Sequence, residues 1–243
     1  MKGILIIDKP EGWTSFDAVK KLRGAIRRGT SEKLKIGHGG TLDPLATGVL
    51  PVFIGREYTR LVSLCENMDK EYVAGLRLGI VTDTQDITGT VAAQSPVAVS
   101  RDDLERALGV FRGEILQVPP MYSAIKIGGE RLYAVARRGG EIERAPRPIT
   151  VYDAEIIGGG GADWTLRFVV SKGTYVRTLC HDIGRTLGCG GVMSALRRTR
   201  VGGFRVEDAL GVVRASELAA DGALGEWLIR DVMGLGRDNG GYK

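Results

Sequence analysis

The pattern of apolar and polar positions predicts a strand, a turn and a helix at the start of the chain. The apolar run of residues 3–7 is typical of a strand, and Lys9-Pro10-Glu11-Gly12 is typical of the turn after it. Thr14 and Ser15 are good N-cap residues, and apolar side chains follow them at helical spacing. The apolar stripe predicted for this helix consists of Phe16, Val19, Leu22 and Ile26.

The next part of the chain predicts a loop, two strands and a second helix. Residues 29–48 are rich in Gly, Thr and Pro and predict a loop, and residues 50–54 predict a buried strand. Apolar positions alternate over residues 72–78, as in a strand with one buried face. Ser100 and Asp103 have the spacing of a capping box. The stripe of the helix that follows is Leu104, Ala107, Leu108 and Phe111.

The second half of the chain mixes irregular segments with strands and helices. Residues 117–149 hold proline and glycine pairs among basic residues and predict an excursion from the fold. Residues 149–157 and 164–170 predict a hairpin across four glycines, and residues 174–187 predict a helix. A terminal helix is predicted from Leu218, Leu224, Trp227, Leu228 and Val232. Strands and helices follow no regular βαβ order, so we expect an α+β fold with a mainly antiparallel central sheet.

Composition narrows the class of protein and favours a polyanionic partner. The chain has 243 residues, 43% hydrophobic and 26% charged, with no apolar run long enough to span a membrane. Three cysteines form no disulfide framework, so we expect a cytoplasmic protein. The formal net charge is +5, and basic residues gather in residues 20–35, 126–147 and 197–205. Such clusters suit a nucleic-acid backbone, although solvated helix faces are an equally good explanation from charge alone.

Several familiar chemistries do not fit the motifs. Gly37-His38-Gly39-Gly40 is followed neither by the Lys of a phosphate loop nor by the third glycine of a Rossmann motif. Cys180, His181 and Cys189 are a weak metal-ligand set, so we expect no metal. Asp43 lies between Leu42 and Pro44 in the glycine-rich loop. A carboxylate restricted by a following proline suits nucleophilic or acid–base chemistry, although Leu-Asp-Pro alone is an ordinary turn.

Taken together, the motifs resemble those of TruB-type tRNA pseudouridine synthases over residues 3–210. Each block alone is moderately specific, and their shared order makes the resemblance strong. The matching blocks are Asp8–Ser15, Gly37–Leu50, Lys70–Tyr72 with Leu78–Thr84, Pro119–Lys126, Ser171–Leu179 and Leu196–Thr199. The resemblance implies a pseudouridine synthase fold and isomerisation of uridine 55 in the T-loop of tRNA, by base flipping and without a cofactor.

The resemblance also implies roles for individual residues. Asp43 matches the nucleophilic aspartate, and Arg177 matches the arginine that pairs with it. Tyr72 matches the tyrosine that stacks on the target base and takes part in the final proton transfer. His38 matches a histidine near the displaced nucleotide. Turn formation, surface exposure or core packing remain the plain alternatives for these residues.

Further residues are candidate contacts to the substrate. Tyr175 and Leu196 match positions that line the uracil pocket, and either side chain also suits ordinary core packing. Charge clustering makes four residues candidate phosphate contacts, namely Lys9, Lys172, Arg197 and Arg198. The excursion over residues 120–148 matches the family's RNA-clamping thumb loop.

The domain organisation is expected to be simple. Residues 1–210 form the predicted catalytic domain, and residues 211–243 are too short for the C-terminal PUA domain that family members usually carry. We expect a monomer whose partner is tRNA, bound through its T-arm, with no membrane association. Two alternatives remain open at this stage. One is a non-catalytic RNA-binding or RNA-folding protein, and the other is a glycoside hydrolase with Asp43 and Asp86 as its carboxylates.

Overall fold

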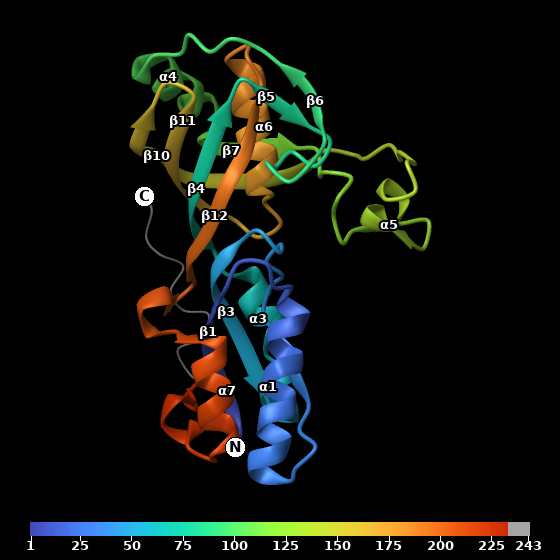
Figure 1. Ribbon diagram of the computed structural model, residues 1–243, viewed down its shortest axis with the longest axis vertical. Helices are drawn as coiled ribbons and strands as arrows, with labels where there is room; N and C mark the ends of the chain where they lie inside the picture. The colour runs from blue at the N-terminus through green and yellow to red at the C-terminus, as the bar shows by residue number, and fades with distance from the viewer. Residues whose placement is uncertain (233–243) are drawn as a thin grey trace. The chain divides into compact units, whose positions relative to one another are not determined.

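The computed structural model describes residues 1–232 of the chain (Figure 1). The chain divides into two compact units. The first contains Met1–Tyr72 and the residues from Leu196 onward, and the second contains Val73–Ala195. The strands β4 (Lys70–Leu78) and β12 (Gly191–Val201) each contain a unit boundary, so each contributes residues to both units. The mixture of sheet and helices confirms the predicted α+β class.

The first unit is built on paired strands from both ends of the chain. β1 and β3 are antiparallel along their length, from Gly3 opposite Ile54 to Lys9 opposite Gly48. β12 runs parallel to β3, and β14 runs parallel to β1. The strands that belong to this unit alone are β1 (Gly3–Lys9), β2 (Ile36–His38), β3 (Thr47–Ile54), β13 (Phe204–Arg205) and β14 (Leu210–Gly211).

Helix α1 (Ser15–Thr30) begins where the sequence predicts, and three of the four residues of its predicted stripe are buried, namely Val19, Leu22 and Ile26. Thr14 and Asp17 form a capping box at its N-terminus. Phe16, expected in the stripe, is 59% exposed. The buried face also includes smaller residues that the pattern did not predict, and these let the helix pack closely on its neighbours. These buried residues are Ser15, Ala18, Val19, Leu22, Ala25 and Ile26.

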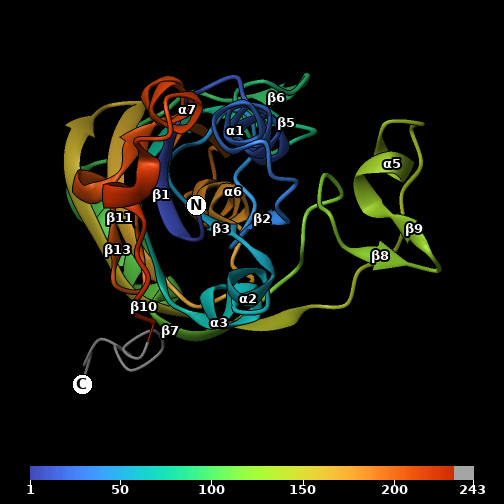
Figure 2. The ribbon, with the colours of Figure 1, turned by 90° about the horizontal axis from the view of Figure 1, so that it is seen from below.

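The predicted terminal helix is only partly correct. Helix α7 (Val212–Ala220) lies beside α1 and shares its apolar core (Figure 2). It ends before Gly222, whose φ of 74° turns the chain, and Leu224–Trp227 form a separate 3-10 helix. Residues 233–243 of the predicted tail lie outside the described residues. Short elements that the sequence pattern did not predict are α2 (Arg56–Thr59), α3 (Val62–Asn67), the 3-10 helix Val206–Asp208 and β2 within the expected loop.

The two glycines of α1 allow a direct test of this packing. A Cβ at Gly29 would overlap the carbonyl oxygen of Ala219 in α7, whereas a Cβ at Gly24 would meet only the guanidinium of Arg28, at 3.7 Å. We expect Gly29→Ala to lower the free energy of unfolding by about 1–3 kcal/mol, as overpacking does. Gly24→Ala is expected to raise it by about 0.5–1 kcal/mol through helix propensity. Urea unfolding of both variants checks this, and equal effects would contradict the described packing.

The second unit combines a sheet with three helices, one of which lies in the excursion after β7. Its strands follow the order β4, β11, β10, β7, and β10 is antiparallel to both neighbours. The predicted hairpin is confirmed, but β10 continues through the glycines and the turn falls at residues 161–162. The elements are β5 (Ile80–Thr82), β6 (Val91–Gln94), α4 (Arg101–Phe111), β7 (Gly113–Gln117), β10 (Arg147–Gly160), β11 (Asp163–Val170) and α6 (Val176–Thr186).

The predicted excursion leaves the sheet after β7 and returns at β10. It carries a short hairpin and one helix, namely β8 (Lys126–Ile127), β9 (Glu130–Arg131) and α5 (Leu132–Ala136). Leu132 and Val135 are its buried residues on α5. Within residues 1–232, no helix is both long enough and apolar enough to span a bilayer.

Candidate active site

Asp43 lies in the loop between β2 and β3 of the first unit. Its side chain is partly buried, and its carbonyl oxygen accepts a hydrogen bond from the Ala46 amide at 3.0 Å. That bond closes a turn around Pro44, which leads directly into β3. The predicted turn conformation is therefore present, and the Leu42 side chain just before Asp43 is buried.

Ser15 fixes the residue immediately before Asp43. Its hydroxyl accepts a hydrogen bond from the Leu42 amide at 2.9 Å and lies 3.3 Å from the Leu42 carbonyl oxygen, to which it donates. Ser15 is only 2% exposed, so water does not compete for these bonds. The sequence pattern indicated Ser15 only as a helix-capping residue. It is instead a clamp from the first turn of α1 onto the Asp43 loop.

Lys9 fixes the residue immediately after Asp43. Its ammonium group donates to the carbonyl oxygens of Trp13 at 2.6 Å, Pro10 at 2.9 Å and Pro44 at 3.5 Å. The Gly12 amide donates to the same Pro44 oxygen at 2.8 Å. Burial lowers the pKa of Lys9 to about 8, and the charge of Asp43 opposes that shift. Lys9 is fully buried, so the expected phosphate contact is wrong for this position in the structure.

Arg198 holds the loop at both of its ends. Its Nε donates to the Val49 carbonyl at 2.8 Å and its Nη2 donates to the Gly40 carbonyl at 3.2 Å. Arg198 is 1% exposed, so it too is buried and cannot face a phosphate as expected. The adjacent Arg197 is different. Its guanidinium is 42% exposed and forms a two-pronged pair with Asp8, with N–O distances of 2.8 and 3.2 Å.

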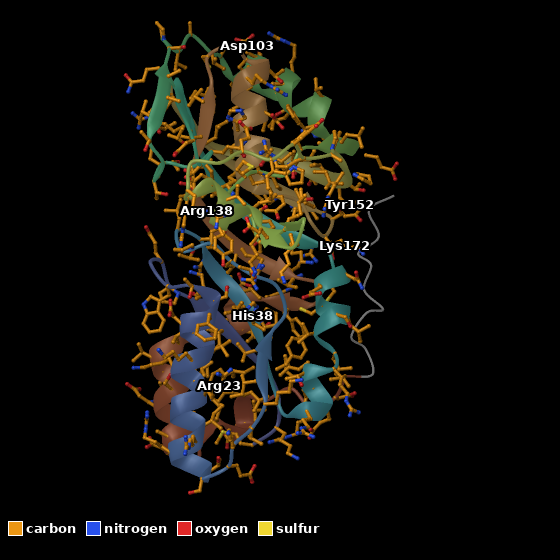
Figure 3. The ribbon with its side chains drawn as sticks, turned by 90° about the vertical axis from the view of Figure 1, so that its right-hand side faces the viewer. Arg23, His38, Asp103, Arg138, Tyr152 and Lys172 are labelled. Atoms are coloured by element: carbon orange, nitrogen blue, oxygen red, sulfur yellow. The ribbon has the colours of Figure 1, made fainter. Side chains whose placement is uncertain are left out.

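The remaining predicted residues of the first unit are at least partly buried. Tyr72 is 8% exposed on β4 and Leu196 is 9% exposed on β12. His38 is the last residue of β2 and is labelled in Figure 3. Its Nδ1 is buried and has no hydrogen-bond partner among the described residues. Burial, followed by the charge of Arg198, lowers the pKa of His38 below its ordinary value, so the ring is neutral at pH 7.

The shifted His38 pKa predicts a pH dependence of stability. Below the ordinary histidine pKa of about 6.5 the unfolded chain takes up a proton that folded His38 resists, so stability falls as the pH drops. His38→Gln removes this contribution and is expected to show a shallower loss as the pH is lowered from about 7.5 to about 5.5, one unit either side of that pKa. Urea unfolding at both pH values measures it. His181 has a lowered pKa for the same main reason, so His181→Gln serves as the comparison, and an unchanged slope in His38→Gln would contradict the account.

In the second unit, Arg177 is held on helix α6 by two oxygens from other segments. Its guanidinium donates from Nη2 to the Tyr122 carbonyl at 2.7 Å, and its Nη1 lies 3.9 Å from the Asp86 carboxylate. Asp86 is itself buried and accepts hydrogen bonds from the Thr84 hydroxyl at 3.0 Å and from the amide and hydroxyl of Thr88. Arg177 is 6% exposed, so it is a buried cation fixed in position rather than a surface arginine.

Tyr175 is fixed through its backbone by a side chain from β7. Gln117 accepts from the Tyr175 amide at 2.8 Å and donates to the Tyr175 carbonyl at 3.1 Å. Gln117 is 3% exposed and supplies the cap that no side chain at the N-terminus of α6 provides. The Tyr175 ring lies 5.8 Å from Cζ of Arg177, within cation–π range. Lys172, labelled in Figure 3, is exposed just before this helix.

Sequence reasoning missed these supporting residues for a physical reason. Ser15, Asp86 and Gln117 act on residues 27, 91 and 58 positions away, and such contacts leave no local periodicity. One signal was present for Asp86, since Thr84 and Thr88 flank it at a spacing of two residues and offer hydroxyl donors to a buried carboxylate. Among the residues that the structure describes, no group of three His, Cys, Asp or Glu side chains could hold a metal ion.

Comparison with known protein families identifies the family of the chain. The model of the TruB family pseudouridylate synthase N-terminal domain matches residues 27–176. The tRNA pseudouridylate synthase B C-terminal domain model matches residues 177–229. The chain belongs to the TruB family of pseudouridylate synthases. It is therefore an isomerase, and its fold is the pseudouridine synthase fold that the motifs predict.

Individual TruB relatives agree with the assignment. The chain is 46% identical over 217 residues to tRNA pseudouridine synthase B of Syntrophomonas wolfei, covering 86% of this chain and 70% of that protein. It is 43% identical over 238 residues to the enzyme of that name from Pseudomonas aeruginosa, covering 97% and 76%.

A solved Cbf5-Nop10-Gar1 complex contains a similar chain, with a TM-score of 0.68 and 34% identity. The match covers 93% of this chain and 57% of that one.

Proposed function

We propose that the protein converts uridine to pseudouridine at position 55 in the T-loop of tRNA, with Asp43 as the nucleophile. Membership of the TruB family supports the reaction, and the relatives' shared name supports tRNA as the substrate. The observation that carries the proposal is the set of buried clamps around Asp43. Ser15, Lys9 and Arg198 fix the backbone on both sides of one partly exposed carboxylate.

The reaction needs no group beyond the substrate and the side chains. The bond between C1′ of the ribose and N1 of uracil breaks, the base turns, and C5 bonds to C1′. C5 loses its proton and N1 gains one, so atoms and electrons balance without an oxidant or a cofactor. The Asp43 carboxylate supports bond cleavage by attacking C1′ or by removing a ribose proton, and both routes need the same fixed anion.

The other residues assist the flipped nucleotide in this proposal. Arg177 takes the role of the arginine that the family resemblance pairs with the nucleophile, and Asp86 and the Tyr122 carbonyl hold its guanidinium in position. Asp86 is thus a positioning residue, and its saturation by threonine donors does not suit the acid of a glycoside hydrolase. Tyr72 stacks on the displaced uracil, and neutral His38 takes a place near the gap that the base leaves.

Release of tritium tests the reaction itself. A tRNA transcript labelled with tritium at C5 of uridine loses the label only where C5 bonds to C1′. We expect release of about one equivalent per tRNA, and no release when the T-loop uridine is replaced by cytidine. Release from the cytidine transcript would contradict the T-loop assignment, and tight binding without any release would favour the non-catalytic RNA-binding alternative.

The Ser15 clamp provides a prediction within this proposal. Ser15→Ala removes two hydrogen bonds to Leu42 and is expected to cost about 1–3 kcal/mol of stability. Because Asp43 then loses its fixed position, we also expect kcat to fall roughly 10-fold or more, as small misplacements of a reacting group do. Ser216→Ala is the control, since that buried hydroxyl bonds only the Val212 carbonyl within α7. Equal kcat in both variants would contradict a role for the clamp.

A further inference from the structure

A groove lies along the exposed side of α1 in the first unit. It is lined by the backbone at Gly12 and Gly24 and by five side chains, those of Trp13, Asp17, Lys20, Lys21 and Arg28. The groove from Asp17 to Arg28 spans about eleven helical residues, which is about 16 Å. Arg23, labelled in Figure 3, bonds the Ile36 carbonyl at 3.5 Å and so lies on the other flank of the helix, toward β2.

The charges of this groove are not neutralised by the fold. Lys20, Lys21 and Arg28 are exposed and form no salt bridge with any residue in the described part of the chain. Asp17 is the one acid of the lining, and its carboxylate is already bound by the amide and hydroxyl of Thr14 in the capping box. Asp17 attracts Lys20, but none of the three cations of the groove forms a salt bridge with a described residue.

Gly24 gives the second, independent observation. It lies in the middle of an exposed helix face, where glycine costs about 1 kcal/mol relative to alanine. Gly29 of the same helix is explained by the close approach of α7, but the atom nearest to a Cβ at Gly24 would be in the flexible Arg28 guanidinium, at an ordinary contact distance of 3.7 Å. The fold gives no reason for a glycine there. A reason exists if a ligand approaches the helix backbone between the flanking lysines and Arg28.

The position of the groove favours RNA as that ligand. Its Trp13 end is joined to the Asp43 loop, because Lys9 donates to the carbonyl oxygens of both Trp13 and Pro44 and the Gly12 amide donates to Pro44. A strand of RNA leaving the reacting nucleotide can follow the groove, with phosphates on the cations and the Trp13 indole available for stacking. An acidic protein would use the charges but would have no need of a bare helix backbone or of continuity with Asp43.

We propose that the α1 groove binds the phosphate backbone of the substrate RNA, with Lys20, Lys21 and Arg28 as phosphate contacts and Gly24 as the point of closest approach. This inference rests on the proposed function, because it extends the same substrate beyond the Asp43 loop. It assigns to three members of the basic cluster of residues 20–35 a role that charge alone left open.

Two matched pairs of variants test the proposal on the full chain with an unmodified tRNA transcript. Gly24→Leu fills the groove, and Gly109→Leu fills an equally open position on the exposed face of α4. Lys20→Gln with Lys21→Gln removes two charges from the groove, and Lys33→Gln with Lys35→Gln removes two exposed charges outside it. Dissociation constants at several salt concentrations and the tritium release of the wild type are measured together.

We expect Gly24→Leu to weaken binding at least about 5-fold relative to Gly109→Leu. The Lys20/Lys21 variant should make the slope of log K against log salt about 1.4 less steep. That is the change expected when two phosphate contacts to a single strand are lost. The Lys33/Lys35 variant should change the slope much less.

Equal affinities in the Gly24 and Gly109 variants would overturn the groove proposal. Equal salt slopes in the two charge variants would overturn it as well. The groove would be assigned to an acidic protein if the Lys20/Lys21 variant lost its affinity for polyaspartate but kept its affinity for the transcript. If the wild type releases no tritium at all, the proposed function fails instead.

Discussion

Asp43→Asn is expected to abolish pseudouridine formation while leaving the folded protein and its RNA affinity intact. The amide keeps the shape of the side chain, and the hydrogen bond from the Ala46 amide uses the Asp43 backbone oxygen, so the turn remains. The variant loses the anion that supports cleavage of the glycosidic bond. We expect the rate to fall by at least about 1,000-fold, the scale on which enzymes lose activity with their nucleophile.

Tritium release from the labelled transcript and the dissociation constant for the same RNA measure the two halves of this prediction. Asp221→Asn is the control, because it removes one exposed negative charge at the C-terminus of α7 and touches no residue of the site. Residual activity above about a tenth of wild type in Asp43→Asn would show that the carboxylate is not the nucleophile. Loss of binding together with activity would point to a structural role.

Gly48→Ala is expected to cause the largest loss of stability among substitutions near the site. Gly48 has a φ of 102°, where an L-residue is strained by about 1–2 kcal/mol. A Cβ there would also overlap the backbone carbonyl of Arg198, which lies opposite Gly48 in the parallel β3–β12 pairing. Forcing those strands apart adds about 1–3 kcal/mol, so we expect a total loss of about 2–5 kcal/mol.

Gly12→Ala separates the two causes of this loss. Gly12 has a φ of 80°, but a Cβ added there would have no other atom within 4 Å, so only the backbone strain of about 1–2 kcal/mol applies. Urea unfolding of both variants gives the comparison. Equal losses would mean that β3 and β12 do not approach as closely at Gly48 as described, and the buried Arg198 bonds to the Asp43 loop would then lack their support.

Much of the fold follows from local patterns, because those patterns are enforced by burial on one face. The alternation over residues 72–78 becomes β4, and the Ser100–Asp103 capping box begins α4 where it is expected. The error at Phe16 has an instructive cause. The helix buries Ala18 and Ala25 in the core that it shares with α7, and a search for large apolar residues misses such small ones.

Less of the candidate site than of the fold follows from the sequence. Motifs identify Asp43, Tyr72 and Arg177, but they do not say what holds them. Lys9 and Arg198 look like phosphate contacts from charge alone, yet burial makes them internal donors to backbone carbonyls of the Asp43 loop. A cluster of basic residues in the sequence does not show which face of a strand each one occupies. Tertiary packing determines which of them are buried.

The most direct test of the account is a map of pseudouridine at every uridine of an unmodified tRNA transcript after incubation with the full chain. We predict modification at position 55 in the T-loop and nowhere else, with none after incubation with Asp43→Asn. Modification at a different uridine, or an identical map from Asp43→Asn, would contradict it.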